Sequence, residues 1–205
     1  ILTMSFCSLE YLIVFVRSTN AHPLLIFLTA GEFGIAFDSP LTPDEMAAIR
    51  RKEAEQAAHA LGASVIIMSF PDSGLSFIPL EKIVEAVMPI IRDYEADGIF
   101  SFDPFATADL IDHPDHNVAG QTARYSAMAD VRYFQPESKA LQRRPALYLL
   151  TRPKEGVHVL PHTAELDKRR TEYMEKHYPS QFRPEKRDEW VTFFDSTIEA
   201  YERVR

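Results

Sequence analysis

The stretch LLIFLTAGE, at residues 24–32, decides the fold class of this chain. Five consecutive apolar residues that end in a polar turn are typical of a strand buried on both faces, and such strands belong to parallel sheets. Two more runs of this type, at 63–68 and 99–102, predict further buried strands. We therefore expect parallel strands whose polar turns gather at one edge of a sheet.

Helix signals lie between these strands. The sequence TPDE at 42–45 combines a cap, a proline at the first helical position and a glutamate three residues after the cap, while Gly62 supplies the stop. Apolar residues at helical spacing from 83 to 91 predict a second helix. The alternation of strands and helices argues for an α/β fold with right-handed crossovers. Farther along the chain, we expect strands at 146–150 and 157–160 and helices at 163–177 and 187–202.

Composition excludes several classes of protein. A length of 205 residues usually makes one compact domain, so we expect 1–205 to be a single domain. A net charge of −8 without a long basic run argues against a nucleic-acid surface. The apolar runs at 12–16 and 24–28 are far shorter than the ~20 residues of a membrane span. A single cysteine, Cys7, excludes an internal disulfide. The N-terminus lacks the features of a signal peptide, so we expect a cytoplasmic protein.

The sequence HPDH at 113–116 carries the clearest chemical signal. If Pro114 opens a helix, His113 and His116 fall on neighbouring points of one helical face. One imidazole can then bind a metal while the other moves a proton, as in one half of a metal-hydrolase site. Two solvated histidines at a helix start would have the same spacing, and two histidines do not complete a zinc site.

Several short motifs follow the predicted strands in a fixed order. This series resembles the PIG-L/LmbE-like family of zinc-dependent N-acetylglucosaminyl deacetylases over roughly residues 24 to 182. The resemblance implies a Rossmann-like three-layer sandwich with a mostly parallel sheet, one zinc ion bound by two histidines and an aspartate, and hydrolysis of an acetamide on a glucosamine unit. The motifs are Thr29-x-Gly31-Glu32, Arg50-x-x-Glu53 with Leu61-Gly62, Asp72-Ser73-Gly74, Asp103-Pro104, His113-Pro114-Asp115-His116 and His177-x-x-Ser180-Gln181.

The resemblance also implies roles for the HPDH motif. His116 corresponds to a zinc ligand, and His113 to the proton donor and electrostatic stabiliser of the tetrahedral intermediate. Asp115 would orient His113, since a carboxylate beside an imidazole fixes its tautomer. An amide is a poor electrophile with a poor leaving group, so its hydrolysis requires a Lewis acid, an activated water and an acid for the departing amine.

The family places its other two zinc ligands and its general base in an Ala-His-Pro-Asp-Asp-Glu segment after the first strand, and this chain has no such segment. His22 cannot replace the missing ligands, because it lies in the turn before the strand at 24. A strand of about five residues would separate it by ~17 Å from the strand end where the catalytic motifs gather. Counting places the lost motif at or just before residues 1–4. We therefore expect a chain that is truncated or degenerate at its N-terminus.

Three hypotheses follow from these observations. The first is a zinc-dependent deacetylase acting on a small-molecule sugar conjugate that contains N-acetylglucosamine. The second is a non-catalytic α/β binding domain that has lost its metal. The third is a metal-independent hydrolase that uses His113 and Asp115, which no serine or cysteine nucleophile motif supports. The sequence leaves the oligomeric state open, with a homo-oligomer among the alternatives.

Four further residues are candidates for substrate binding. Arg50 stands where the family places a substrate-contacting arginine, although a solvated helix surface would also accept it. Asp72 resembles a family position near the sugar. Glu32 and Asp103 end buried strands and so are predicted to face the cleft, yet acidic residues there also cap helices and bond loop amides.

Overall fold

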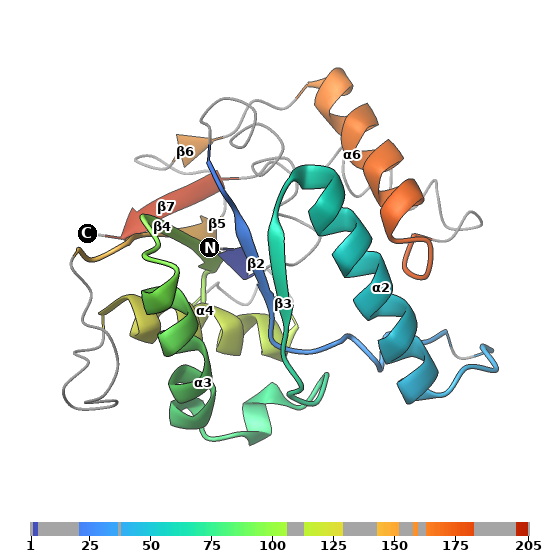
Figure 1. The fold of residues 1–205 in the computed structure, drawn as a ribbon, viewed down its shortest axis with the longest axis horizontal. Helices are drawn as coiled ribbons and strands as arrows, with labels where there is room; N and C mark the ends of the chain where they lie inside the picture. The colour runs from blue at the N-terminus through green and yellow to red at the C-terminus, as the bar shows by residue number, and fades with distance from the viewer. Residues whose placement is uncertain are drawn as a thin grey trace.

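A computed structural model describes residues 2–3, 21–36, 38–105, 113–128, 143–151, 158–159, 163–182 and 200–204 (Figure 1). Strands and helices alternate along most of the chain, as the sequence predicts. The elements in chain order are β1 (Leu2–Thr3), β2 (Leu24–Phe27), α2 (Pro43–Leu61), β3 (Ser64–Ile67), η2 (Leu75–Phe77), α3 (Leu80–Asp93), β4 (Gly98–Phe102), α4 (Pro114–Met128), β5 (Ala146–Thr151), β6 (His158–Val159), α6 (Ala164–His177) and β7 (Ala200–Val204).

The strands form one seven-stranded sheet in the order β3-β2-β1-β4-β5-β7-β6. The pairs from β3 to β5 are all parallel, whereas β7 runs antiparallel to both β5 and β6. The direction of chain progression reverses between β1 and β4, and in such sheets ligands bind outside the carboxyl ends of the strands near that reversal. The predicted Rossmann-like architecture with a mostly parallel sheet is confirmed.

Helices cover both faces of the sheet, which gives three layers (Figure 1). Alternate residues of β2 point to opposite faces. Leu24 and Ile26 belong to the apolar cluster that includes α3 and α4. Leu25 and Phe27 belong to a second cluster with Ala58 of α2. The continuous apolar run at 24–28 is thus explained, because a central parallel strand is buried on both sides.

Helix α2 begins and ends where the sequence predicts. The Thr42 side chain accepts a hydrogen bond from the backbone N–H of Glu45 at 3.3 Å, and the Glu45 carboxylate accepts the backbone N–H of Thr42 at 2.8 Å. The backbone hydrogen bond from Thr42, followed by the bond from its hydroxyl, lowers the pKa of Glu45. Gly62 ends the helix with a φ of 67°, a left-handed conformation that favours glycine.

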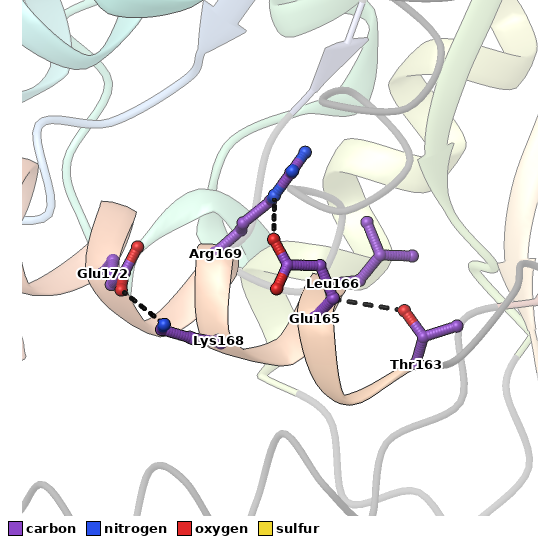
Figure 2. A network of polar contacts seen from close by, with 6 residues as sticks. All are labelled: Thr163, Glu165, Leu166, Lys168, Arg169 and Glu172. Carbon is purple, nitrogen blue, oxygen red and sulfur yellow. Dashed lines mark hydrogen bonds and ion pairs between the residues drawn. The ribbon is translucent and has the colours of Figure 1, made fainter.

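Helix α6 also forms from local signals. The Thr163 hydroxyl accepts a hydrogen bond from the N–H of Leu166, and two ion pairs follow along the exposed surface (Figure 2). α6 lies beside α2 on one face of the sheet (Figure 1). The Tyr173 hydroxyl donates to the Ala57 carbonyl oxygen at 2.6 Å, which ties the two helices together.

One predicted helix is wrong at its end. The sequence pattern predicts a helix over 187–202, but residues 200–204 form β7, and residues 187–199 lie outside the described part of the chain. Five residues of β7 pair with β5, so backbone hydrogen bonds supplied by a distant strand override the local preference.

Candidate active site

A cavity of about 420 Å³ lies at the carboxyl ends of β2 and β3. Phe27 and Ile67 are register partners at these strand ends and form part of its apolar wall. Its polar wall carries two arginines of α2 and the two histidines of the HPDH motif, which are Arg50, Arg51, His113 and His116. The strand-end turns and the first turn of α4 thus meet at one place, as expected for a parallel sheet.

His113 and His116 are brought together in the predicted way. α4 begins at Pro114, and the centroids of the two imidazole rings lie 5.8 Å apart. The His116 ring stacks on Phe102, the last residue of β4, with centroids 4.1 Å apart and planes 2° from parallel. This stacking fixes the orientation of His116 at the cavity wall.

Gly120 permits this stacking. A Cβ at this position would collide with the carbonyl oxygen of Phe102 and lie 3.0 Å from the Pro104 side chain. The lack of a side chain lets α4 approach the end of β4 closely, and His116 lies one turn before Gly120 on the same helix. The spacing of the HPDH motif alone did not reveal this requirement.

The hydrogen bonds of His113 indicate its tautomer. Its Nδ1 accepts the backbone N–H of Asp115 at 3.3 Å, so in the neutral ring the proton sits on Nε2. The Nε2 atom lies 3.4 Å from the hydroxyl of Ser73, which also lines the cavity. The N–H donor of this tautomer therefore lies on the cavity side of the ring.

The Asp115 carboxylate has a different partner from the one predicted. The family resemblance predicts that it orients His113, but its Oδ1 accepts the backbone N–H of Leu75 at 3.1 Å. The contact with His113 comes from the Asp115 backbone instead. Asp115 is buried, and its carboxylate ties α4 to η2, since a buried carboxylate requires donors nearby. Asp115 therefore holds the HPDH turn against the segment after β3.

Arg50, a predicted substrate-contacting residue, lies in the cavity wall. Its Nη2 donates to the Gly34 carbonyl oxygen at 2.7 Å, and the turn after β2 packs closely around the guanidinium. A Cβ at Gly31 would lie 2.6 Å from Arg50 Nη1, and Gly31 has a φ of 70°. The backbone conformation at Gly31 thus favours glycine in the Thr29-x-Gly31-Glu32 motif, and an added side chain there would displace the Arg50 guanidinium.

The three other acidic candidates bond loop amides, which was the alternative prediction for Glu32 and Asp103. Glu32 accepts the backbone N–H of Asp72 at 2.8 Å. Asp72 accepts the Phe33 N–H at 2.9 Å and the Thr29 hydroxyl at 3.2 Å. These bonds fasten the turns after β2 and β3 to each other, and Asp72 also lines the cavity. Asp103 accepts the Phe105 N–H two residues ahead at 2.9 Å, within its own turn.

Sequence reasoning missed several residues of the wall. Arg51 donates to the carbonyl oxygens of Ile67 and Met68 at 3.2 and 3.3 Å, at the end of β3. Tyr178 and Gln181 reach the wall from the segment after α6. Burial raises the pKa of Tyr178, and the negative charge of Glu53 adds to this shift. The Ser180-Gln181 motif was a signal for this segment, but the sequence did not show where it lies.

The described residues do not make a complete zinc site. Among them, no group of three or more histidine, cysteine, aspartate or glutamate side chains is placed to hold a metal ion. His116 is oriented and lines the cavity, and His113 is engaged through Nδ1. The part of the chain that the structure describes therefore offers fewer than the three protein ligands of a catalytic zinc. In the same residues, no helix is long and apolar enough to cross a membrane.

The sequence places the chain in a known family. The family model of PIG-L, GlcNAc-PI de-N-acetylase, matches residues 7–127, more than half of the chain. The chain belongs to the PIG-L family. This match confirms the predicted family relationship, and its range includes Arg50, Asp72 and the HPDH motif of this PIG-L member.

Solved structures share the PIG-L fold of this chain. An N,N'-diacetylchitobiose deacetylase from Pyrococcus horikoshii matches 97% of this chain and 79% of its own, with a TM-score of 0.80 at 20% identity. GalB, a 4-carboxy-2-hydroxymuconate hydratase from Pseudomonas putida, matches 98% and 92%, with a TM-score of 0.69 at 16% identity. A deacetylase of the teicoplanin biosynthetic pathway matches 99% and 97%, with a TM-score of 0.61 at 17% identity. At these identities, the similarity concerns the fold.

Proposed function

We propose that this protein is a deacetylase, which hydrolyses the acetamide of an N-acetylglucosamine unit in a small sugar conjugate. The observation that carries the proposal is the HPDH pair in the wall of the cavity, within a chain of the PIG-L family. The cavity volume of about 420 Å³ lies within the range of small-molecule sites. Two structural neighbours, the N,N'-diacetylchitobiose deacetylase and the deacetylase of the teicoplanin biosynthetic pathway, are named for the same type of reaction.

In the proposed reaction, water adds to the acetyl carbonyl, the C–N bond breaks, and acetate and a sugar amine leave. His113 is suited to stabilise the developing oxyanion, because Nδ1 accepts the Asp115 N–H and the Nε2–H therefore lies on the cavity side, beside Ser73. To protonate the departing amine, His113 would need a second proton on Nδ1, which requires release of the Asp115 N–H. The bond to Asp115 therefore favours oxyanion stabilisation as its first role.

We assign His116 to a zinc ion. The ring already has a fixed orientation, and a zinc ion bound there would supply a Lewis acid for the carbonyl. The two further ligands and the general base that the family resemblance implies have no counterpart among the described residues. The proposal therefore assigns one ligand and derives no step through the metal.

Zinc content and acetate release test the proposal together. We expect the His113→Ala variant to keep its zinc and lose about 10²-fold or more in turnover, because it removes only the donor. The His116→Ala variant should lose both zinc and activity. His59→Ala, which changes an exposed histidine of α2, is the control and should match the wild type. Full activity of His113→Ala would refute the assigned role.

The second hypothesis, a non-catalytic binding domain, has one supporting observation: the incomplete ligand set among the described residues. It predicts that the chain binds N-acetylglucosamine conjugates without releasing acetate, in the presence or absence of added zinc. Calorimetric binding measured beside acetate release separates the two functions.

A further inference from the structure

The buried carboxylate of Glu53 has no role in the proposed chemistry. Its side chain is 6% exposed on α2. Oε1 accepts the backbone N–H of Ser180 at 2.8 Å, and Oε2 accepts the Ser180 hydroxyl at 2.6 Å. These two residues are 127 positions apart in the chain. Carboxylates are rarely buried unless donors meet them, so this pair of bonds requires an explanation.

The two bonds connect two segments that both line the cavity. On α2, Arg50 and Arg51 stand one turn before Glu53, and both lie in the wall. On the other side, Tyr178 and Gln181 flank Ser180 and also lie in the wall. The Glu53 carboxylate therefore sets the position of the turn that presents Gln181 relative to the helix that presents the two arginines.

Attachment of α6 to α2 has independent support. Tyr173 donates to the Ala57 carbonyl oxygen, and Ala57 packs in an apolar cluster with Met174 and Phe182. Apolar packing would hold the helices together at least as well as a buried charge. A carboxylate that engages both the backbone and the side chain of one residue instead fixes that residue's position, because hydrogen bonds are directional.

We infer that Glu53 is a positioning residue for substrate binding, which holds the Ser180 turn so that Gln181 can contact the sugar. The inference rests on the proposed function, and it joins two motifs, Arg50-x-x-Glu53 and Ser180-Gln181, in one contact. The amide of Gln181 can donate and accept hydrogen bonds, which suits a sugar hydroxyl or an acetamide.

Steady-state kinetics of Glu53→Ala test this role. KM for an N-acetylglucosamine conjugate should rise roughly tenfold, the size expected for loss of hydrogen bonds to a charged group. The value of kcat should change by less than about twofold, because the lost contact acts on bound substrate and transition state alike. Glu53→Gln should restore most of the affinity, since its amide can still accept from the Ser180 N–H and donate to the hydroxyl.

Tyr173→Phe is the matched control. It removes a hydrogen bond that joins α6 to α2, but Tyr173 is not among the residues that line the cavity. We expect its KM to equal that of the wild type. Amide hydrogen exchange at Ser180 should accelerate in Glu53→Ala and stay unchanged in Tyr173→Phe. Ser180→Ala, which leaves the backbone bond in place, should give a smaller rise in KM than Glu53→Ala and provides a test if Glu53→Ala does not fold.

Two results would overturn the inference. One is an unchanged KM in a folded Glu53→Ala or Ser180→Ala variant, and the other is an equal rise in KM for Tyr173→Phe. If the wild type releases no acetate, the proposed function fails and the dissociation constant of N-acetylglucosamine, measured by calorimetry, replaces KM. Weaker binding in Glu53→Ala alone would then still support the positioning role, and equal affinity of all variants would refute it.

Discussion

α3 and α4 cover one face of the sheet through a continuous apolar cluster, whereas α2 and α6 cover the other through small apolar contacts and buried hydrogen bonds. On the first face, Ile83, Val87 and Ile91 of α3 are 0 to 1% exposed. On the second, Glu53 bonds Ser180 and Tyr173 bonds the Ala57 carbonyl. Apolar burial is non-directional and contributes stability, while hydrogen bonds fix relative positions. The cavity opens beside the second face, where position matters.

The largest effect should come from the apolar face. Ile83→Ala should lower the free energy of unfolding by about 2 to 5 kcal/mol, because it removes buried methylenes and leaves a cavity. Urea denaturation measures this change. Ile49→Ala, the same change at a residue of α2 that is 36% exposed, should stay within about 0.5 kcal/mol of the wild type. A similar loss in both variants would show that burial of Ile83 in the apolar cluster is not the source of this stability.

An intermediate effect should appear where the apolar face meets the site. Gly120→Ala should cost about 1 to 3 kcal/mol in the free energy of unfolding, because the Phe102 carbonyl oxygen cannot move aside for a Cβ. This outweighs the gain of about 1 kcal/mol in helix propensity. Activity should also fall, because the added Cβ would push α4 away from β4 and move His116 off the Phe102 ring.

Gly62→Ala sharpens this prediction. A Cβ at Gly62 would meet no atom within 4 Å, but its φ of 67° strains any side chain. Its expected cost of about 1 kcal/mol should leave activity unchanged. If both glycine variants had the same effect on acetate release, close approach of α4 would not be what positions His116.

The smallest effect should be a pH dependence at the α2 and α6 face. Burial, and then the charge of Lys176, lower the pKa of His177, whose ring lies 4.6 Å from that of Tyr173. The contribution of this group to stability is therefore present above its unfolded pKa near 6.5 and lost as the pH falls through the lower folded value.

Thermal unfolding between pH 7.5 and pH 5 checks this sign. The unfolding temperature should fall with acidification less steeply in His177→Gln than in the wild type. Lys176→Gln should keep most of the dependence, because burial is the larger cause of the lowered pKa. A steeper fall in His177→Gln would mean that the sign is wrong.

Local signals fixed much of the fold in advance. The capping box at Thr42 and the left-handed Gly62 bound α2 through atoms within four residues of each other, so the sequence predicts both ends. The apolar runs likewise predict the parallel strands. Local signals do not predict the strand at residues 200–204. These residues form a strand because they pair with β5, which lies about fifty residues away in the chain.

The features of the candidate site also separate into those that local sequence predicts and those that only tertiary packing establishes. The sequence by itself determined that His113 and His116 lie close together at the start of a helix, because helical periodicity is a local property. The alternation of strands and helices along the chain also predicted that the strand-end turns gather at one edge of a parallel sheet. Only the tertiary structure decided which carboxylates hold the turns together, how Gly120 lets α4 approach β4, and that Glu53 reaches Ser180. Each of these depends on the distance between segments far apart in the chain, and the sequence pattern does not record that distance.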